Sequence, residues 1–374
     1  MSLHAARRDR LLSQLREEGL DALLVTSPVN VTYLTGFTGE ATYLVLGRRK
    51  TLLISDGRFV VQLAEECPDI ETFIRPPGQL LPDATGQTLA KLGLRSVGFE
   101  SGHLTVADFE AIRARSEGID WKSGPGRVEV LRAVKDASEL ARIRQAIDIA
   151  QIAFERFREG MRADSTEKQM HDMMEFHIRS LGGRTTSFPT IVAVGSRGAL
   201  PHAPPTRRTL GENPCLLVDW GADEGLYKSD LTRVLWTRKP TPAPGTAALY
   251  DKFMEVVGVI QRARNAALAE MRPGVEAQVV DAAARRVITD AGYGNFFNHS
   301  IGHGLGMQVH EMPLLRSGNP MKLEAGMVVT VEPGIYLPDE FGVRIEDDIW
   351  ITPDGPVMLT SVPQSPDELA IGLL

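Results

Sequence analysis

The pattern of apolar and polar positions divides the chain into two parts. In the first part, short apolar runs alternate with amphipathic stretches of helical periodicity. This pattern predicts helices over 3–18, 83–92 and 105–115 and strands over 21–25, 41–46, 51–54 and 97–99. Helices and strands that alternate in this way are typical of an α/β domain.

A polar segment at residues 123–127 (SGPGR) combines residues that break helices with residues that leave the backbone flexible. A segment of this composition is typical of a domain boundary. We therefore predict an N-terminal α/β domain over residues 1–127 and a second domain over residues 128–374. The first domain contains no recognisable catalytic constellation, and its basic residues 47–50 are interpreted as the solvated tip of a hairpin.

Longer helices follow the boundary. The apolar positions predict a helix over 135–159, a second helix that opens at 160–162 and ends at 181–183, a third over 246–269 and a fourth from 276 to 291. Two Met-Arg pairs begin at Met161 and Met271, which are 110 positions apart, and the glycines at Gly182 and Gly292 have the same separation. These equal separations indicate an internal duplication of a helix–helix unit.

An acidic strand segment follows each predicted helix pair. In the first segment, residues 216–234, we place a two-residue turn at Glu224-Gly225, which sets Asp219 directly opposite Asp230. Opposed residues on one face of a strand pair have Cβ atoms about 4.5–5.5 Å apart, and like charges at this distance repel. Such an arrangement is expected only where a positive group lies between the carboxylates.

In the second segment, residues 327–346, a hairpin centred on Asp339 sets Glu332 opposite Glu346. Pro333 interrupts the ladder beside Glu332. One carboxylate pair alone would suggest a solvated turn, but a pair on each of two hairpins indicates a cation site.

A loop rich in histidine and glycine lies between the acidic segments. The candidate histidines are His299, His303 and His310 in this loop and His202 in a proline-rich loop at 200–205. Four carboxylates and one imidazole bring four negative charges, which two divalent cations neutralise. Oxygen-rich ligation favours manganese, with cobalt and zinc as alternatives. Two metal ions that share a water molecule would support hydrolysis.

Composition limits the classes of function. The 374 residues are 43% hydrophobic and 24% charged, as in folded globular proteins. The formal net charge of −7 disfavours a nucleic-acid partner. No apolar run approaches the roughly 20 residues of a membrane helix, the N-terminus resembles no signal peptide, and only two cysteines occur. We therefore expect a cytoplasmic protein without a membrane partner.

Five segments together resemble one family of enzymes. They are VDWGA at 218–222, YKSDLTR at 227–233, HSIGHGLGMQVHE at 299–311, TVEPGIY at 330–336 and VRIED at 343–347. In this order and at these separations they are similar to the Xaa-Pro peptidase group of the pita-bread metallopeptidases, which includes prolidase and aminopeptidase P. The resemblance implies an α/β N-terminal domain followed by an α+β catalytic domain with the pita-bread (creatinase/aminopeptidase-like) fold.

The resemblance also implies roles for individual residues. Two metal ions would be held by Asp219, Asp230, His303, Glu332 and Glu346, with Asp230 and Glu346 bridging the ions. Substrate positioning and oxyanion stabilisation are implied for His202, His299 and His310. Arg344 matches an arginine beside a metal-bound glutamate, and Tyr336 matches a tyrosine near the site in aminopeptidase P. The family glutamate that corresponds to Glu332 also moves a proton from the attacking water to the leaving amine.

The activity that the resemblance implies is hydrolysis of the bond between an N-terminal residue and proline, carried out on a peptide substrate by a homodimer. The short loop between Tyr336 and Arg344 offers few positions for recognising a dipeptide carboxylate, so Xaa-Pro dipeptidase and Xaa-Pro aminopeptidase both stay open. The alternatives are a creatinase-like amidinohydrolase and a non-catalytic protein-binding member of the fold. The complete set of five ligands disfavours both.

Overall fold

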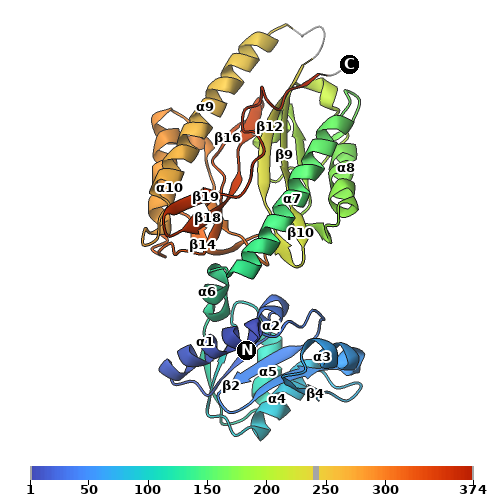
Figure 1. Cartoon of the computed structure of the whole chain (residues 1–374), viewed down its shortest axis with the longest axis vertical. Coiled ribbons are helices and arrows are strands. Elements are labelled where there is room, and N and C mark those ends of the chain that lie inside the picture. Colours follow the sequence, from blue (N-terminus) through green and yellow to red (C-terminus); the bar gives the residue numbers. More distant parts are fainter. Residues whose placement is uncertain (1, 239–243, 373–374) are drawn as a thin grey trace. The chain divides into compact units, whose positions relative to one another are not determined.

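The computed structural model describes residues 2–238 and 244–372 (Figure 1). The chain forms two compact units, of which the first ends at Arg132 and the second begins at Ala133. The boundary predicted from the sequence lies five residues earlier, after the first residue of helix α6 (Arg127–Ala133). Hydrogen bonds tie α6 to the first unit, because Leu131 accepts one from the Tyr33 hydroxyl and Arg132 donates one to Asn30.

The first unit is an α/β domain built on one six-stranded sheet, with the strand order β4-β3-β2-β1-β5-β6. Its strands are β1 (Ala22–Val25), β2 (Tyr43–Gly47), β3 (Thr51–Ser55), β4 (Glu71–Ile74), β5 (Ser96–Phe99) and β6 (Asp120–Ser123). Its helices are α1 (Leu3–Glu17), α2 (Pro28–Thr35), α3 (Val60–Glu66), α4 (Leu81–Lys91) and α5 (Val106–Ala114), with a 3-10 turn at Gly57–Phe59. Strand β1 is buried along its whole length because both of its edges are paired and its faces are covered.

The helices and strands predicted for this unit are present, and five further ones, α2, α3, α6, β4 and β6, were missed. Helices α2 and α3 have only 8 and 7 residues, which is too short for a helical period to stand out. Strands β4 and β6 form the two edges of the sheet and are largely exposed, so their sequences lack the apolar run of a buried strand.

The second unit contains two helix pairs, α7 (Ala137–Gly160) with α8 (Glu167–Ser180) and α9 (Thr246–Glu270) with α10 (Ala277–Asp290). Helices α8 and α10 begin and end 110 positions apart, and α7 and α9 end 110 positions apart. Gly182 and Gly292, which follow the second helix of each pair, both have positive φ, 103° and 88°. The predicted duplication of a helix–helix unit is therefore confirmed.

The strands of this unit lie between the helix pairs, with α7 and α8 on one side and α9 and α10 on the other (Figure 1). One sheet has the order β20-β12-β9-β8 and another the order β14-β13-β15-β18-β19. Their strands are β8 (Ile191–Val194), β9 (Cys215–Trp220), β12 (Leu231–Arg238), β20 (Ile371–Gly372), β13 (Gly302–Gly304), β14 (Glu311–Leu315), β15 (Val328–Val331), β18 (Asp347–Thr352) and β19 (Gly355–Met358). A two-stranded sheet consists of β16 (Gly334–Leu337) and β17 (Phe341–Arg344). A three-stranded sheet consists of β7 (Thr185–Thr186), β10 (Ala222–Glu224) and β11 (Tyr227–Lys228). The 3-10 turns are at Gly195–Ala199, Leu210–Glu212 and Gly294–Phe296.

Helices α7 and α8 pack on the sheet β20-β12-β9-β8 through apolar side chains, whereas α9 and α10 share a cluster with strands of both sheets. Phe154 and Phe157 of α7 and Met174 of α8 share a buried cluster with residues of β8, β9 and β12. The Trp220 ring stacks on Phe154, with ring centroids 4.2 Å apart, and its indole N–H donates to the Ala150 carbonyl over 2.9 Å. These contacts hold the end of β9, and with it the neighbouring Asp219, in a fixed position.

The register of the first acidic hairpin differs from the prediction. Gly225 and Leu226 both have positive φ, 53° and 75°, and form the two-residue turn. Asp219 therefore lies opposite Thr232, and the prediction that it lies directly opposite Asp230 is wrong. The turn was assigned one position too early, because an apolar residue with a Cβ rarely adopts positive φ. Asp230 is instead a diagonal neighbour of Asp219 on the same face.

The register of the second acidic hairpin agrees with the prediction. Leu337 pairs with Phe341 around Asp339, whose φ is 63°. Strands β15 and β18 continue this pairing in the same register, with Val331 opposite Asp347. The pairing is interrupted between the two strand pairs, where Glu332 and Glu346 lie. In the described ranges 2–238 and 244–372, no helix combines the length and the apolar character required to cross a membrane.

Candidate active site

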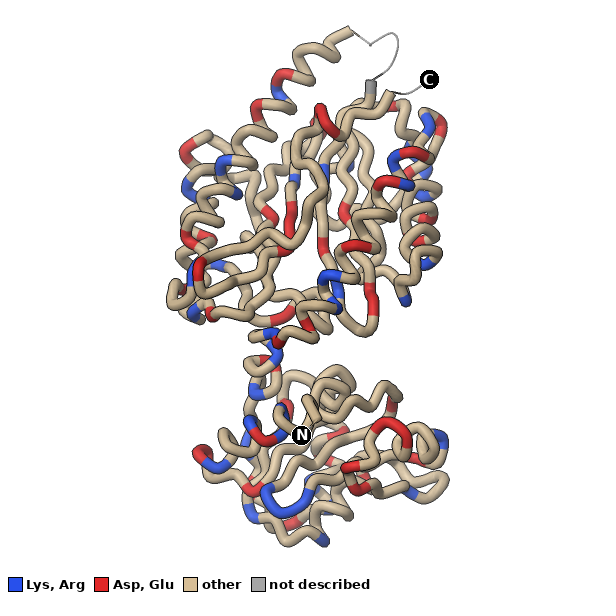
Figure 2. The backbone as a smooth tube through the Cα atoms, in the orientation of Figure 1, with Lys and Arg blue, Asp and Glu red and all other residues tan. Residues whose placement is uncertain are grey.

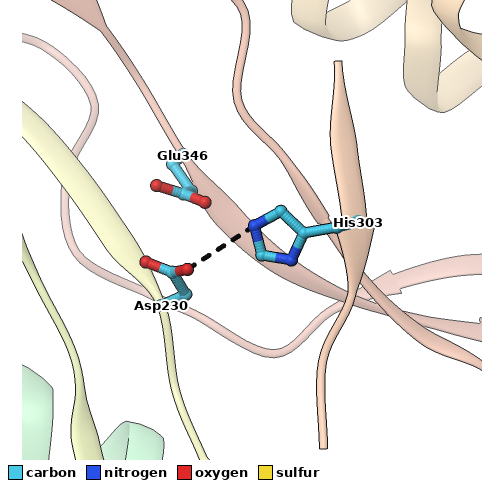
Figure 3. A group of neighbouring side chains, drawn as sticks. All are labelled: Asp230, His303 and Glu346. Atoms are coloured by element: carbon cyan, nitrogen blue, oxygen red, sulfur yellow. Dashed lines mark ion pairs between the residues drawn. The ribbon is translucent and has the colours of Figure 1, made fainter. Parts of the chain in front are cut away.

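Three of the predicted ligands converge on one point inside the second unit. Asp230 directly precedes β12, His303 lies on β13, and Glu346 lies between β17 and β18. Each offers one ligand atom, and these three atoms lie within 4.8 Å of one another. Figure 3 shows the three side chains directed at a common centre, with His303 Nε2 3.7 Å from a carboxylate oxygen of Asp230. All three residues are buried.

The other two predicted ligands line the same cavity, which has a volume of about 500 Å³. Glu332 follows β15 directly, and one of its carboxylate oxygens lies 3.5 Å from His303 Nε2. Asp219 lies on β9, and its Oδ2 accepts a hydrogen bond from Arg344. Its Oδ1 is buried and has no hydrogen-bond partner among the residues that the structure describes. The fold thus brings all five predicted ligands to one cavity.

A break in strand pairing directs the two glutamates into the cavity. The register sets Glu332 opposite Glu346, but their backbones do not pair with each other. The Glu332 N–H donates to the Ile301 carbonyl over 2.7 Å, and the Glu346 N–H donates to the Thr232 carbonyl over 3.1 Å. The Thr232 hydroxyl also donates to the Glu346 carboxylate over 2.7 Å. Each glutamate is therefore fixed to a different strand, and the two strands separate where the carboxylates lie.

Burial raises the pKa of all four carboxyl groups. For Glu346, burial and then the charge of Asp219 raise the pKa to about 8. The pKa values of Asp230 and Glu332 rise well above their usual range, first through burial and then through repulsion from Glu346. Burial also raises the pKa of Asp219, although Arg344 opposes this effect. Without a compensating cation, the four groups cannot all be ionised at neutral pH.

His303 presents an unprotonated nitrogen to the carboxylates. Burial, followed by the neighbouring His310, lowers its pKa to about 3, so the ring is neutral at pH 7. Its Nδ1 lies 3.2 Å from the Gly304 carbonyl oxygen, which can only accept a hydrogen bond, so Nδ1 carries the proton. The lone pair of Nε2 then faces Asp230 and Glu332, as required of a metal ligand.

The donor set fits a centre of divalent cations. It combines four carboxylates and one neutral imidazole, which suits manganese, cobalt or zinc. The unsatisfied Oδ1 of Asp219 is a second indication, because a buried carboxylate oxygen without a partner is costly unless a cation occupies its lone pairs.

A chain of hydrogen bonds runs from one ligand to His299. Arg344 donates to the Asp219 carboxylate, to the Thr232 hydroxyl over 3.0 Å and to the Tyr336 hydroxyl over 2.8 Å. The Tyr336 hydroxyl lies 2.9 Å from His299 Nε2, and His299 Nδ1 lies 2.7 Å from the Ser300 carbonyl oxygen. Burial, followed by the charge of Arg344, lowers the pKa of His299 to about 4, so the ring is neutral. Both of its nitrogens are engaged within the protein.

The other two predicted histidines lie at the mouth of the cavity. His202 and His310 line it and are exposed. The His310 ring stands edge-on to the His303 ring, with 4.4 Å between centroids. Burial, followed by the charge of His202, lowers the pKa of His310. These positions allow both side chains to reach a molecule that enters the cavity.

Sequence reasoning missed two features of the site. Thr232 bridges Arg344 and Glu346 through its hydroxyl, and only the correct hairpin register would have shown that it lies opposite Asp219. The apolar wall of the cavity was also missed, because its residues come from loops and strand ends without a common pattern. The wall is formed by Phe188, Pro189, Ile191, Pro201, Ala203, Pro204, Pro205, Val309 and Leu314.

The raised pKa of Glu346 predicts how the stability of the metal-free protein depends on pH. The folded state holds this proton up to about pH 8, whereas the unfolded chain releases it near the ordinary value of 4.5. The folded state therefore loses stability as pH rises between these values. We expect the unfolding temperature of chelator-treated protein to fall between pH 5.5 and pH 8. The variant Glu346→Gln should show a smaller fall, and an unchanged slope in this variant would contradict the assignment.

Comparisons with known proteins agree with this geometry. Residues 141–353 match the model of metallopeptidase family M24, and residues 7–134 match the creatinase/prolidase N-terminal domain. An uncharacterized peptidase of Bacillus subtilis is 36% identical over 97% of this chain and 99% of its own length. An Xaa-Pro dipeptidase from Bacillus anthracis has a similar structure, with a TM-score of 0.89 and 32% identity over 99% of this chain and all of the other.

A second similar structure is an X-Pro aminopeptidase from Thermotoga maritima, with a TM-score of 0.84 and 32% identity over 98% of this chain and all of the other. These matches extend over both units. They confirm the fold class expected from the sequence, an α/β N-terminal domain followed by a pita-bread catalytic domain. The chain therefore belongs to metallopeptidase family M24, in the group whose relatives are Xaa-Pro peptidases.

Proposed function

We propose that this protein is a metal-dependent exopeptidase that hydrolyses the bond between an N-terminal residue and proline at a dinuclear metal centre. The convergence of four carboxylates, three of them buried, and the Nε2 lone pair of His303 on one cavity carries this proposal. The printed names of the similar structures supply the substrate class, since one is an Xaa-Pro dipeptidase and another an X-Pro aminopeptidase. Manganese is the proposed metal, with cobalt and zinc as alternatives.

The proposed ligands are Asp219, Asp230, His303, Glu332 and Glu346, with Asp230 and Glu346 between the two ions. Two bound cations would lower the pKa of a shared water molecule and polarise a carbonyl group. Arg344 and Thr232 hold Asp219 and Glu346 in place, because each donates a hydrogen bond to one oxygen of the carboxylate.

Glu332 is the proposed general acid and base. Its side chain is 15% exposed, lines the cavity and has a pKa well above the usual range, first through burial. A carboxyl group with these properties can take up a proton at neutral pH and release it to the proline nitrogen. His202 and His310, at the mouth, are proposed to position the substrate and to stabilise the oxyanion. His299 and Tyr336 act with them by orienting Arg344.

The apolar wall suits a proline ring. Proline has no N–H to satisfy when its nitrogen is acylated, and its ring fixes the backbone angle. A pocket lined by Phe188, Ile191 and Val309 can bury such a ring without leaving a donor unpaired. A creatinase-like amidinohydrolase would leave the five-ligand set without a role, and an assay with creatine distinguishes the two activities.

Removal of metal tests the proposal directly. Protein stripped with a chelator is expected to lose hydrolysis of Ala-Pro-Ala, and addition of manganese is expected to restore it with two ions bound per chain. Cobalt and zinc serve as comparison metals, and calorimetric titration gives the stoichiometry. Undiminished hydrolysis by the stripped protein would contradict the mechanism. A homodimeric assembly and a cytoplasmic location stay predictions from the sequence.

A further inference from the structure

The segment over residues 195–205, the His202 loop, forms part of the cavity wall. It leaves the end of β8 and contributes Pro201, His202, Ala203, Pro204 and Pro205 to the cavity lining. The His202 side chain is exposed and forms no hydrogen bond with the residues that the structure describes. The place of its ring at the mouth therefore depends on how the backbone of the loop is held.

Both ends of the His202 loop are bonded to Glu167, the first residue of α8. The Glu167 carboxylate is fully buried and accepts a hydrogen bond over 2.9 Å from the N–H of Val194, which precedes the loop. It also accepts bonds from the N–H and the hydroxyl of Thr206, which follows the loop, over 2.9 Å and 2.5 Å. Within the loop, Arg197 Nε donates to both oxygens of Glu167, and the same guanidinium donates to the Pro204 carbonyl. One carboxylate thus closes the base of the loop, and one arginine extends the connection to the cavity wall.

The Glu167 carboxylate does not serve the helix on which it lies. The N-terminus of α8 is capped by Thr166 and Gln169, since the side chain of each accepts a hydrogen bond from the backbone N–H of the other. The donors to Glu167 lie in the His202 loop or directly beside it. Helix capping is therefore provided by other residues.

The internal repeat leads to the same conclusion. The position equivalent to Glu167, 110 residues later, is Ala277, the first residue of α10. Ala277 is also fully buried, and its N–H donates to the Met321 carbonyl over 2.8 Å, as the Glu167 N–H donates to the Arg208 carbonyl over 2.9 Å. The backbone arrangement is thus the same in both copies with an alanine in one of them. A glutamate at this position is required by something other than the repeated fold.

On the basis of the proposed function, we propose that Glu167 is a positioning residue for the substrate. Together with Arg197 it holds the His202 loop so that the His202 ring reaches a bound peptide. Neither Glu167 nor Arg197 lines the cavity, so both act through the loop. The five proposed metal ligands lie outside residues 194–206, so loss of the Glu167 carboxylate should displace His202 and leave metal binding unchanged.

The first experiment removes the carboxylate and keeps the shape of the side chain. Glu167→Gln presents an amide donor in place of one acceptor oxygen. On manganese-loaded protein we expect kcat/KM for Ala-Pro-Ala to fall by about tenfold or more, because displacement of a positioned group by about 1 Å costs up to about a hundredfold. The stoichiometry and affinity for manganese in calorimetric titration should not change. The control is Asp172→Asn, which removes an exposed carboxylate that pairs with Lys168 on the same helix and should keep wild-type values.

A double-mutant cycle decides whether the loss is transmitted through His202. His202→Ala and Glu167→Gln should each lower kcat/KM, and Glu167→Gln should have little further effect in the His202→Ala background, because the ring that it positions is then absent. Independent losses that multiply would overturn the inference and leave the proposed function intact. Full activity of His202→Ala would overturn it as well. Absence of hydrolysis by the wild type would refute the proposed function, and the inference with it.

A second variant and a direct measurement on the loop separate this role from a general loss of folding. Arg197 is 21% exposed, so Arg197→Met is expected to fold, and its effect on kcat/KM should also disappear in the His202→Ala background. Hydrogen exchange in both variants should become faster in peptides that cover 194–206 and stay at the wild-type rate in peptides that cover 299–311. Faster exchange throughout the second unit would show a general loss of stability and would overturn the inference.

Discussion

Replacement of Asp230 by asparagine is expected to lower kcat/KM by about a thousandfold or more, because it removes a central ligand while keeping the side-chain shape. Asp230 is 4% exposed. One of its carboxylate oxygens lies within 4.8 Å of a ligand atom of His303 and of one of Glu346. The loss should appear as reduced metal binding in calorimetric titration together with reduced hydrolysis.

The same variant should not lose stability in the absence of metal. Burial and the neighbouring carboxylates raise the pKa of Asp230 far above its usual range, so the charged form is unfavourable in the folded state. Asparagine removes this charge, and the unfolding temperature of the metal-free variant at pH 8 should equal or exceed that of the metal-free wild type. Glu340→Gln is a matched control, because it removes an exposed carboxylate of the same unit that pairs with Lys252. Full activity of Asp230→Asn would refute the assignment of the centre.

The largest effect on stability is expected for Arg233, next to Thr232 on β12. The Arg233 guanidinium is fully buried and donates to Asp347 over 2.6 Å, to the Glu346 carbonyl over 2.6 Å and to the carbonyls of Val362 and Pro363. It thus connects the strand that carries Asp230 to the segment that carries Glu346. Arg233→Met should destabilise the second unit by about 3–5 kcal/mol, because Asp347 and several carbonyls lose their partner. Urea unfolding followed by far-ultraviolet circular dichroism measures this change.

Two comparisons identify the cause of that loss. Arg272→Met removes an arginine that is 62% exposed and only 3.7 Å from Glu270, so it should change stability by less than about 1 kcal/mol. Asp347→Asn in the Arg233→Met background should recover part of the loss, since the uncompensated buried charge is then absent. If the second substitution adds to the destabilisation instead, lost packing and not the unpaired charge is responsible.

The carboxylates of the second unit fall into two groups, those paired with basic side chains and those proposed to hold metal. Figure 2 shows acidic and basic residues alternating over the outer helices of the second unit, where they form solvated pairs such as Lys168 with Asp172. Inside, Asp347 is balanced by Arg233 and Arg264, which lower its pKa against the effect of burial. The cluster around Asp230 has less balance from side chains, since Arg344 is the one arginine or lysine among the described residues that line its cavity and it pairs with Asp219. A bound cation would supply the positive charge that the other carboxylates lack.

The sequence by itself determined the long helices of the second unit, their duplication and the residue types proposed for the site. Apolar periodicity is local, so α7 to α10 could be located from their own residues, and the 110-residue repeat followed from equal spacings. The second hairpin was predictable because a polar loop around Asp339 leaves few choices for its centre. Side-chain type also indicated the four carboxylates that are proposed for a cation centre, and the family resemblance pointed to His303 among four candidate histidines.

The tertiary structure decided how these residues meet. The register of the first hairpin depends on Leu226 adopting a positive φ, which no local preference of leucine indicates. The separation of Glu332 from Glu346 depends on hydrogen bonds to Ile301 and Thr232, and Thr232 is 114 positions from Glu346. The engagement of His299 by Tyr336 and the apolar wall that includes Leu314 depend on packing of the same kind. Contacts between distant segments leave no periodic trace in the sequence, because each is set by the geometry of the whole sheet and not by the residues beside it.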